Sequence, residues 1–376
     1  MTAPSSPVPA WLRKAHDHEH TNTVLRVLAE REHARNRARH SSQNRNNVSL
    51  RHRLSILPPS LSPQKNQLTE HYSVAVGSEP GHQFCNRYMD IMPYDRTRVI
   101  IGGRYFNADW VRERMGGHLM IATQAPLPHT AHDFLSVIAS AQGAHVRTVV
   151  QLTRNIEAGR QKAHIYFPSY PGQSWIIQPN EENRHLAPFQ VTLLKTEAVD
   201  SAHCTISTVS VSEVVSGTAA PPVIFQHMLY AAWPDHGVPE PEDRAGLLEF
   251  IQLVDQRNRA ICNVSTPEAE RPIMVNCSAG VGRTGSFIAL SSLLRAHGIL
   301  GFNSSSPPPM RTSVSPLAVS PLGPLPEAVE WDEVAQEIDA LREQRPGMVQ
   351  REEQALLIYD VLIAAFMGKA RAQESS

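Results

Sequence analysis

Residues 272–287 constrain the fold more than any other stretch of this sequence. The stretch begins with a short apolar run, residues 272–276, which predicts a buried strand. It ends with Phe287 and further apolar residues on one side of a helix, which should stop near Gly298. The loop between strand and helix consists mostly of small residues. The chain must therefore pass from a buried strand into a buried helix through a short loop.

That loop carries Cys277 and, six residues later, Arg283. Glycines allow consecutive backbone N–H groups to surround an anion, and the positive end of the following helix points to the same place. Arg283 could bind two phosphate oxygens at once, and the same donors favour the ionised thiolate of Cys277. The pattern predicts phosphoryl transfer through sulfur. The alternative is an inert structural cysteine, which the ordered glycines disfavour.

The same stretch closely resembles the signature loop of the classical cysteine-based protein tyrosine phosphatases. That loop reads His-Cys, five residues, Arg and then Ser or Thr. The resemblance implies that Cys277 is the nucleophile, that Arg283 binds phosphate, and that the Thr284 hydroxyl eases departure of the thiolate. The loop residues that would bind the phosphate are Ser278, Ala279, Gly280, Val281 and Gly282. Asn276 stands where the family has histidine, so we expect weaker activation of the thiolate.

Composition bounds the class of protein but names no partner. The 376 residues carry a formal net charge of −1 and 41% apolar residues, which is ordinary for a soluble globular protein. The four cysteines show no close pairing, which argues against disulfides and zinc and for a reducing compartment. The sequence shows no signal segment and no apolar run of roughly 20 residues. We therefore expect a cytoplasmic or nuclear protein without a membrane span.

The N-terminal region predicts a loose tail, then a helix, then a linker. Residues 1–21 are rich in Ser, Pro and His, and residues 22–40 combine helical periodicity with many arginines. Such basic faces are usually solvated, and few aromatic residues accompany this one, so we expect no nucleic-acid binding. Residues 55–66, with three prolines, predict an irregular linker.

A Ser/Pro-rich stretch, residues 303–326, predicts a flexible insertion. It contains Ser-Pro pairs at Ser306, Ser315 and Ser320, which are candidate regulatory phosphorylation sites. Residues 369–376 are expected to form a C-terminal tail.

Residues 86–90, Asn-Arg-Tyr-Met-Asp, resemble the family's substrate-recognition loop. The resemblance implies that Tyr88 stacks on the substrate ring and that Asp90 holds a substrate backbone N–H. Without the loop at Cys277, a core tyrosine and a turn aspartate would be preferred. A tyrosine wall deepens the pocket, so that phosphoserine cannot reach the thiolate. Stacking contributes only about 0.5–1.5 kcal/mol, so depth must supply most of the selectivity.

Two further loops resemble catalytic loops of the family. Residues 233–235, Trp-Pro-Asp, lie some 40 residues before Cys277 and resemble its general-acid loop. Asp235 would protonate the leaving phenolate, which typically contributes 10²–10⁴-fold. Near the C-terminus, Gln350 would place the hydrolytic water and Gln354 would support it. Polar caps at a helix N-terminus equally describe these two glutamines.

A cluster of charges at residues 157–162 resembles the mobile charged loop beside the family's site. There, Lys162 would pair with the general acid. A solvated charge cluster is an equally good interpretation.

Periodicity predicts the remaining scaffold. Residues 146–152 predict a strand, residues 188–233 antiparallel strands, and residues 242–257 an amphipathic helix. Two more helices are expected after residues 329 and 351. The resemblance implies one α/β domain, residues 22–368, with a highly twisted mixed sheet flanked by helices on both faces.

The implied reaction is hydrolysis of protein phosphotyrosine through a phosphocysteine. Neither metal nor cofactor is expected, because Arg283 and the backbone N–H groups offset the phosphate charge. One alternative is a catalytically weak or dead phosphotyrosine-binding module, which Asn276 suggests. A dual-specificity phosphatase is the other, and Tyr88 opposes it. The sequence indicates no oligomeric state.

Overall fold

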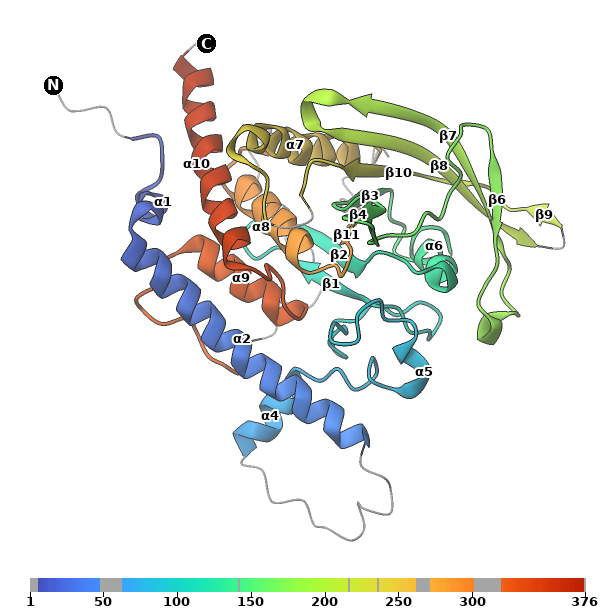
Figure 1. The fold of residues 1–376 in the computed structure, drawn as a ribbon, viewed down its shortest axis with the longest axis horizontal. Coiled ribbons are helices and arrows are strands. Elements are labelled where there is room, and N and C mark those ends of the chain that lie inside the picture. The colour runs from blue at the N-terminus through green and yellow to red at the C-terminus, as the bar shows by residue number, and fades with distance from the viewer. Residues whose placement is uncertain are drawn as a thin grey trace, which may run out of the picture.

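A large mixed β-sheet organises the chain (Figure 1). The computed structural model describes residues 6–47, 63–140, 143–215, 217–234, 237–261, 271–300 and 319–374. Among these residues the sheet has the order β1-β2-β11-β3-β10-β8-β7-β6, with β9 paired to β8. Its strands are β1 Ala108–Arg112, β2 Leu119–Gln124, β3 Thr148–Gln151, β6 Ser174–Ile177, β7 Phe189–Val199, β8 Cys204–Val215, β9 Thr218–Ala219, β10 Val223–Tyr230 and β11 Ile273–Cys277. Two short strands, β4 Ile156–Glu157 and β5 Arg160–Gln161, form a separate hairpin.

The centre of the sheet is parallel and its outer part is antiparallel. Strand β11 pairs in parallel with β2 and β3, and β3 pairs in parallel with β10. Beyond β10, the strands β8, β7 and β6 pair antiparallel. A parallel strand is covered on both faces, which explains why every residue of β11 is buried. The predicted strand at residues 272–276 and the antiparallel strands within residues 188–233 are thus confirmed.

Helices cover both faces of the sheet, as predicted. Helix α6 (Ala131–Ala139) packs on one face, where Phe134 and Leu135 meet Val149 and Met274. On the other face, apolar side chains of four helices form one core cluster with Val275 and Cys277, and α10 packs on α8. These helices are α7 Arg244–Ile261, α8 Gly282–Ala296, α9 Glu333–Gln344 and α10 Glu352–Glu374. Alternation along β11 therefore directs Cys277 and Asn276 to opposite faces.

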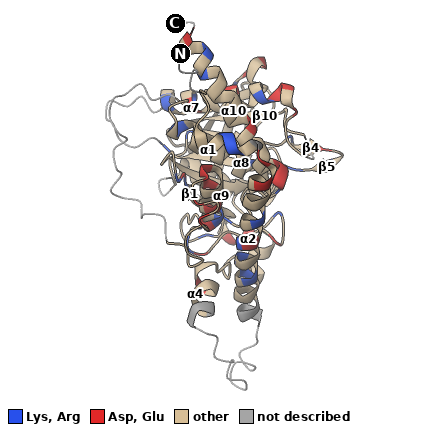
Figure 2. Cartoon of the chain, turned by 90° about the vertical axis from the view of Figure 1, so that its left-hand side faces the viewer, with Lys and Arg blue, Asp and Glu red and all other residues tan. Residues whose placement is uncertain are grey.

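The N-terminal segment is not the loose tail that the sequence predicted. Helix α1 (Ala10–Arg13) buries Leu12, and the long helix α2 (His18–Asn47) begins within the expected tail. Helix α2 runs beside α9 (Figure 1). Figure 2 shows basic and acidic residues interspersed on these two helices. The basic side of α2 is not simply solvated, because Arg35 is fully buried against acidic residues of α9 that lie far away in the sequence.

Other predicted boundaries also change. Helix α4 (Pro63–His71) begins inside the expected linker, and a short helix α5 (Pro80–Gln83) follows it. Helix α10 continues to Glu374, so most of the expected C-terminal tail is helical. Within the expected insertion, residues 303–318 lie outside the described residues. Arg31 donates hydrogen bonds to the carbonyl oxygens of Leu322, Gly323 and Pro324, so residues 319–326 are anchored rather than flexible.

In the described part of the chain, no helix combines the length and the apolar character needed to cross a membrane.

Candidate active site

Cys277 is the last residue of β11, where the loop that leads into α8 begins. Its side chain is only 6% exposed. The backbone N–H of Gly280 points at the sulfur, with a nitrogen–sulfur distance of 3.3 Å. Helix α8 begins at Gly282, so its N-terminus is directed toward the same loop. Burial raises the pKa of two other cysteines, Cys85 and Cys204, to about 12.

Two glycines of this segment are required by close backbone contacts. Gly280 has φ +74°, and a Cβ there would lie 2.1 Å from the carbonyl oxygen of Thr123 on β2. A Cβ on Gly285 would lie 2.4 Å from the backbone nitrogen of Val349. Any larger residue would push the loop away from the sheet or α8 away from residues 348–349. The glycines thus fix the loop on both sides.

Arg345 holds the loop from behind, and sequence reasoning gave it no role. Its guanidinium is fully buried and donates to the carbonyl oxygens of Gly280 at 2.8 Å and Ala279 at 3.1 Å. It also pairs with Asp109 at 2.8 Å and donates to the Asn107 side chain. These bonds turn both carbonyl oxygens toward Arg345. The only sequence signal is an arginine beside Pro346 at the end of a helix, which does not reveal burial.

Burial raises the pKa of Asp109 to about 6, and the charge of Arg345 opposes this shift. The two groups form a fully buried ion pair between β1 and the end of α9. Removing one partner would leave an uncompensated buried charge, so the pair is a strong structural constraint on the loop.

Arg283 is already oriented by a carboxylate. Its two terminal nitrogens lie 2.8 and 2.9 Å from the two oxygens of Glu157, in a bidentate pair. It also donates to the carbonyl oxygens of Leu152 and Pro234. The side chains of Arg283 and Glu157 are 11% and 5% exposed. Sequence reasoning placed Glu157 in the charged loop but did not assign it this partner.

The Pro234 contact brings the general-acid loop to the site. Trp233 is buried and its indole N–H donates to the carbonyl oxygen of Gly237 at 3.3 Å. Asp235, the predicted general acid, lies outside the described residues. Its neighbour Pro234 accepts a hydrogen bond from Arg283 at 2.8 Å, so the segment that leads to Asp235 contacts Arg283.

Three loops converge at Ser278. The Ser278 hydroxyl donates to the carbonyl oxygen of Lys162 at 2.8 Å. Its single proton is then used, so the Tyr88 hydroxyl, 2.8 Å away, is the donor in their mutual hydrogen bond. Tyr88 is 37% exposed and stands at the rim. The structure thus brings together Tyr88 and the cysteine loop, and it brings Lys162 to the same place through its backbone.

The recognition loop is held by its own polar residues. Arg87 donates to the carbonyl oxygens of Ala125 and Pro126. The buried side-chain oxygen of Asn86 accepts from Tyr105 at 2.6 Å and from Asn107 at 2.8 Å. These bonds position the Tyr88 backbone against the end of β2 without using Tyr88 itself.

The remaining predicted residues differ in their placement. Gln354 is buried beside the start of α8, since a Cβ on Gly282 would lie 2.8 Å from its amide nitrogen. Asp90 and Gln350 are exposed and line a cavity of about 600 Å³ between the recognition loop and α2. Thr284 is fully buried, and its hydroxyl has no hydrogen-bond partner among the described residues.

Asn276 is fully buried, and neither polar atom of its side chain has a hydrogen-bond partner within the described chain. Because it faces the side of the sheet opposite Cys277, its amide does not point at the sulfur.

Among the described residues, no cluster of three or more His, Cys, Asp or Glu side chains is arranged to hold a metal ion.

The chain is similar to a large family of known proteins. Residues 82–297, more than half of the chain, match the family model described as protein-tyrosine phosphatase. The chain is 30% identical to the tyrosine-protein phosphatase Lar-like of Caenorhabditis elegans over 306 residues, which is 79% of this chain and 11% of that protein. It is 34% identical to human tyrosine-protein phosphatase non-receptor type 4 over 223 residues, 56% of this chain and 20% of that protein.

A third relative, mouse tyrosine-protein phosphatase non-receptor type 18, is 30% identical over 301 residues, 78% of this chain and 54% of that protein. The chain therefore spans less than two thirds of the length of each of these relatives.

Proposed function

The chain belongs to the protein-tyrosine phosphatase family, and from this premise we propose that it hydrolyses phosphotyrosine in proteins through a phosphocysteine intermediate. One observation carries the proposal. Cys277 lies under the N–H of Gly280 at the start of α8, in the same loop as an arginine that a carboxylate has already oriented. A preorganised set of donors around a nucleophile is the arrangement that phosphoryl transfer requires.

In the first step, the Cys277 thiolate attacks phosphorus. A sulfur–phosphorus bond forms, and the bond between phosphorus and the tyrosine oxygen breaks. Asp235 gives its proton to the departing phenolate oxygen. Arg283 and the N–H groups of residues 278–282 bind the equatorial phosphate oxygens, where charge accumulates.

In the second step, water attacks the phosphocysteine. Gln350 places this water with the support of Gln354, and Asp235 takes its proton. Phosphate leaves and the thiolate is restored, with the Thr284 hydroxyl stabilising it. Lys162 pairs with Asp235 when the general-acid loop closes.

Tyr88 sets the selectivity for phosphotyrosine in this proposal. Its hydrogen bond to Ser278 supports a place at the wall of the substrate pocket, and Asp90 holds the backbone of the bound peptide. A phosphoserine side chain is too short to reach Cys277 past this wall.

The proposal is tested with the purified chain and two peptides that differ only in carrying phosphotyrosine or phosphoserine. Phosphate release is expected from the first peptide alone. Cys277→Ser should bind the phosphotyrosine peptide without turnover. Cys204→Ser, which changes a buried thiol on β8, is the matched control and should keep full activity. Comparable rates on both peptides would favour the dual-specificity alternative, and binding without turnover by the unmodified chain would favour the binding module.

The acid role of Asp235 predicts a graded effect. Asp235→Ala should slow hydrolysis of phosphotyrosine by about 10²–10⁴-fold, and the loss should shrink for aryl phosphates with better leaving groups. An equal loss across a series of leaving groups would argue against proton donation by Asp235.

We also propose that the protein works in the cytoplasm or nucleus. The support is the free thiols of Cys85, Cys204 and Cys277, which suit a reducing compartment. Localisation of a fluorescent fusion of the full-length protein tests this.

A further inference from the structure

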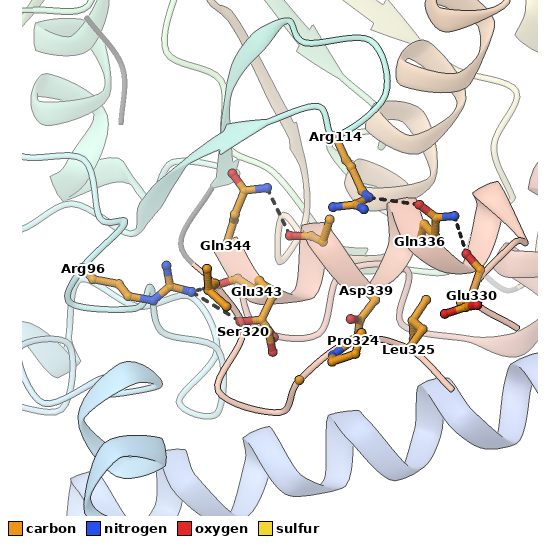
Figure 3. A pocket seen from close by; sticks show the side chains of 13 residues that line it. Arg96, Arg114, Ser320, Pro324, Leu325, Glu330, Gln336, Asp339, Glu343 and Gln344 are labelled. Atoms are coloured by element: carbon orange, nitrogen blue, oxygen red, sulfur yellow. Dashed lines mark hydrogen bonds and ion pairs between the residues drawn. The ribbon is translucent and has the colours of Figure 1, made fainter. Parts of the chain in front are cut away.

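A second cavity, of about 510 Å³, lies beside α9, and none of the candidate active-site residues lines it (Figure 3). Ser320 and Glu343 lie next to each other on its wall, and Arg96 points toward them. Ser320 is half-buried, while the preceding Val319 is 90% exposed. This serine is one of the three Ser-Pro positions in residues 303–326, and the proposed phosphatase function uses none of them.

The Ser320 hydroxyl is bonded to a carboxylate. It donates to Glu343 at 2.9 Å and accepts from the backbone N–H of Leu322 at 3.2 Å. The Tyr72 hydroxyl lies 3.4 Å away and donates to the same Glu343 oxygen at 2.7 Å. Ser320 therefore belongs to a polar cluster that depends on its neutral hydroxyl as a donor.

Glu343 is the centre of that cluster and ties three segments together. It pairs with Arg35 of α2 at 2.7 Å and with His71 of α4 at 3.1 Å. Burial opposes its ionisation, but the hydrogen bonds from His71 and Tyr72 and the charge of Arg35 lower its pKa to about 2. The carboxylate is thus ionised at any physiological pH, and Arg35 is fully buried against it.

We propose that Ser320 is a phosphorylation site for a proline-directed protein kinase, and that its phosphorylation loosens the docking of α2 on α9. Pro321 follows it directly, and a residue before proline is held in an extended conformation, which suits a peptide lying in a kinase groove. In the reaction, the Ser320 oxygen bonds to the γ-phosphorus of ATP. The bond from that phosphorus to the bridging oxygen breaks, ADP leaves, and the hydroxyl proton passes to the kinase base.

The physical effect follows from the neighbours of Ser320. A phosphate replaces the hydroxyl donor with about two negative charges beside the Glu343 carboxylate, and like charges repel. Arg35 cannot serve both groups freely, because it already binds Asp339 at 2.5 Å as well as Glu343. Arg96 could turn to the phosphate only by giving up its bonds to the backbone oxygens of His71 and Glu343. Either response removes contacts that join α2 and α4 to α9.

A consequence for substrates rests on the phosphatase function proposed above. Helix α2 contributes Asn36, Arg39 and His40 to the cavity that Asp90 and Gln350 also line. Undocking of α2 removes this wall, so the KM for a phosphotyrosine peptide should rise. The kcat for a small aryl phosphate, which does not extend into that cavity, should stay the same.

The test compares Ser320→Glu with Ser320→Gln in the full chain, because the two side chains match in size and differ in charge. Trypsin cleavage at the exposed Arg26 and Arg37 of α2 reports its docking. We expect trypsin to cleave α2 about tenfold faster in Ser320→Glu than in Ser320→Gln. A chain with genetically encoded phosphoserine at position 320 should show a similar increase over Ser320→Gln. Equal cleavage rates in all three proteins would contradict the claim that phosphorylation of Ser320 undocks α2 from α9, whatever the phosphatase activity is.

The site itself is tested by treating the full chain with ATP and a proline-directed kinase and mapping the phosphate by mass spectrometry. Phosphorylation at Ser320 that is absent from Ser320→Ala supports the assignment. The other Ser-Pro positions are an internal control, since their modification without that of Ser320 would overturn it.

Discussion

Two fully buried arginines hold two different parts of this protein, and their carboxylate partners behave in opposite ways. Arg345 pairs with Asp109 behind the cysteine loop, and Arg35 pairs with Glu343 between α2 and α9. The pKa of Asp109 is raised to about 6 by burial, although Arg345 opposes the shift. The pKa of Glu343 is lowered to about 2, because the donors around it outweigh burial.

The difference lies in the hydrogen bonds that each carboxylate receives. Asp109 accepts from Arg345 and Thr97. Glu343 accepts from Arg35 twice, and from His71, Tyr72 and Ser320. Burial alone therefore does not decide the charge state of a carboxylate. A buried carboxylate that accepts several hydrogen bonds stays ionised. Of the two arginines, Arg345 is the one that also holds the Cys277 loop.

The largest effect is expected for Arg345→Met. It removes the donors to Gly280 and Ala279 and leaves Asp109 as an unpaired buried charge, so the free energy of unfolding should fall by about 3–5 kcal/mol. Turnover of phosphotyrosine peptide should also be lost. Adding Asp109→Asn removes the unpaired charge and should recover much of the stability, measured by urea unfolding, but little of the activity. If Arg345→Met kept the wild-type kcat/KM, the Arg345–Asp109 ion pair would not be needed to position the Cys277 loop for catalysis.

Arg35→Met should destabilise to a similar or smaller extent, by about 2–4 kcal/mol, because Arg31 and His71 still face the same two carboxylates. The contrast is in function. The kcat for a small aryl phosphate should stay within about threefold of wild type, since Arg35 touches no residue of the loop, while tryptic cleavage of α2 should accelerate. If the activity of Arg35→Met fell as far as that of Arg345→Met, the Arg35–Glu343 and Arg345–Asp109 pairs would not act independently.

The opposite pKa shifts predict opposite pH dependences. The pKa of Glu343 lies below its ordinary value of 4.5, so its carboxylate stabilises the fold above pH 4.5, and this contribution disappears as the pH falls toward 2. The stability advantage of wild type over Glu343→Gln should shrink by about 2 kcal/mol between pH 5 and pH 3.

For Asp109, whose pKa is raised from 3.8 to about 6, wild type should instead lose stability relative to Asp109→Asn as the pH rises from 4 to 6. Urea unfolding of the three proteins, wild type, Glu343→Gln and Asp109→Asn, at several pH values measures both slopes. Slopes of the same sign would show that the two clusters do not differ as described.

The smallest effect is expected at Asn276, a buried polar residue that, unlike the two arginines, has no hydrogen-bond partner in the described chain. Asn276→His adds a group that can carry positive charge, which favours the thiolate. Because side chain 276 faces the side of the sheet opposite Cys277, the charge acts across the strand without direct contact, so the effect is small. Alkylation of Cys277 by iodoacetate at pH 6 should become about two- to tenfold faster. Identical rates would show that this departure from the family pattern is neutral.

The sequence by itself determined the local features of this protein. The strand, the small-residue loop and the helix around Cys277 follow from apolar periodicity and from glycine, and both depend on neighbouring residues only. The spacing of Cys277 and Arg283, and the resemblance at Tyr88, predicted a site to which the structure brings Tyr88 and the Cys277 loop together; the catalytic roles stay predictions. Alternation of apolar residues likewise predicted the antiparallel strands of β7 and β10.

Only the tertiary structure decided which charged residues are partners. Arg283 meets Glu157 across 126 positions, and Arg35 meets Glu343 across 308. A periodic pattern reports which face of a helix is buried, but not what lies opposite that face. From the sequence, an arginine-rich helix is therefore expected to be solvated, and residues 1–21 are expected to be a loose tail. Both expectations were wrong because the carboxylates and apolar side chains that hold these segments come from the other end of the chain, and folding alone brings them together.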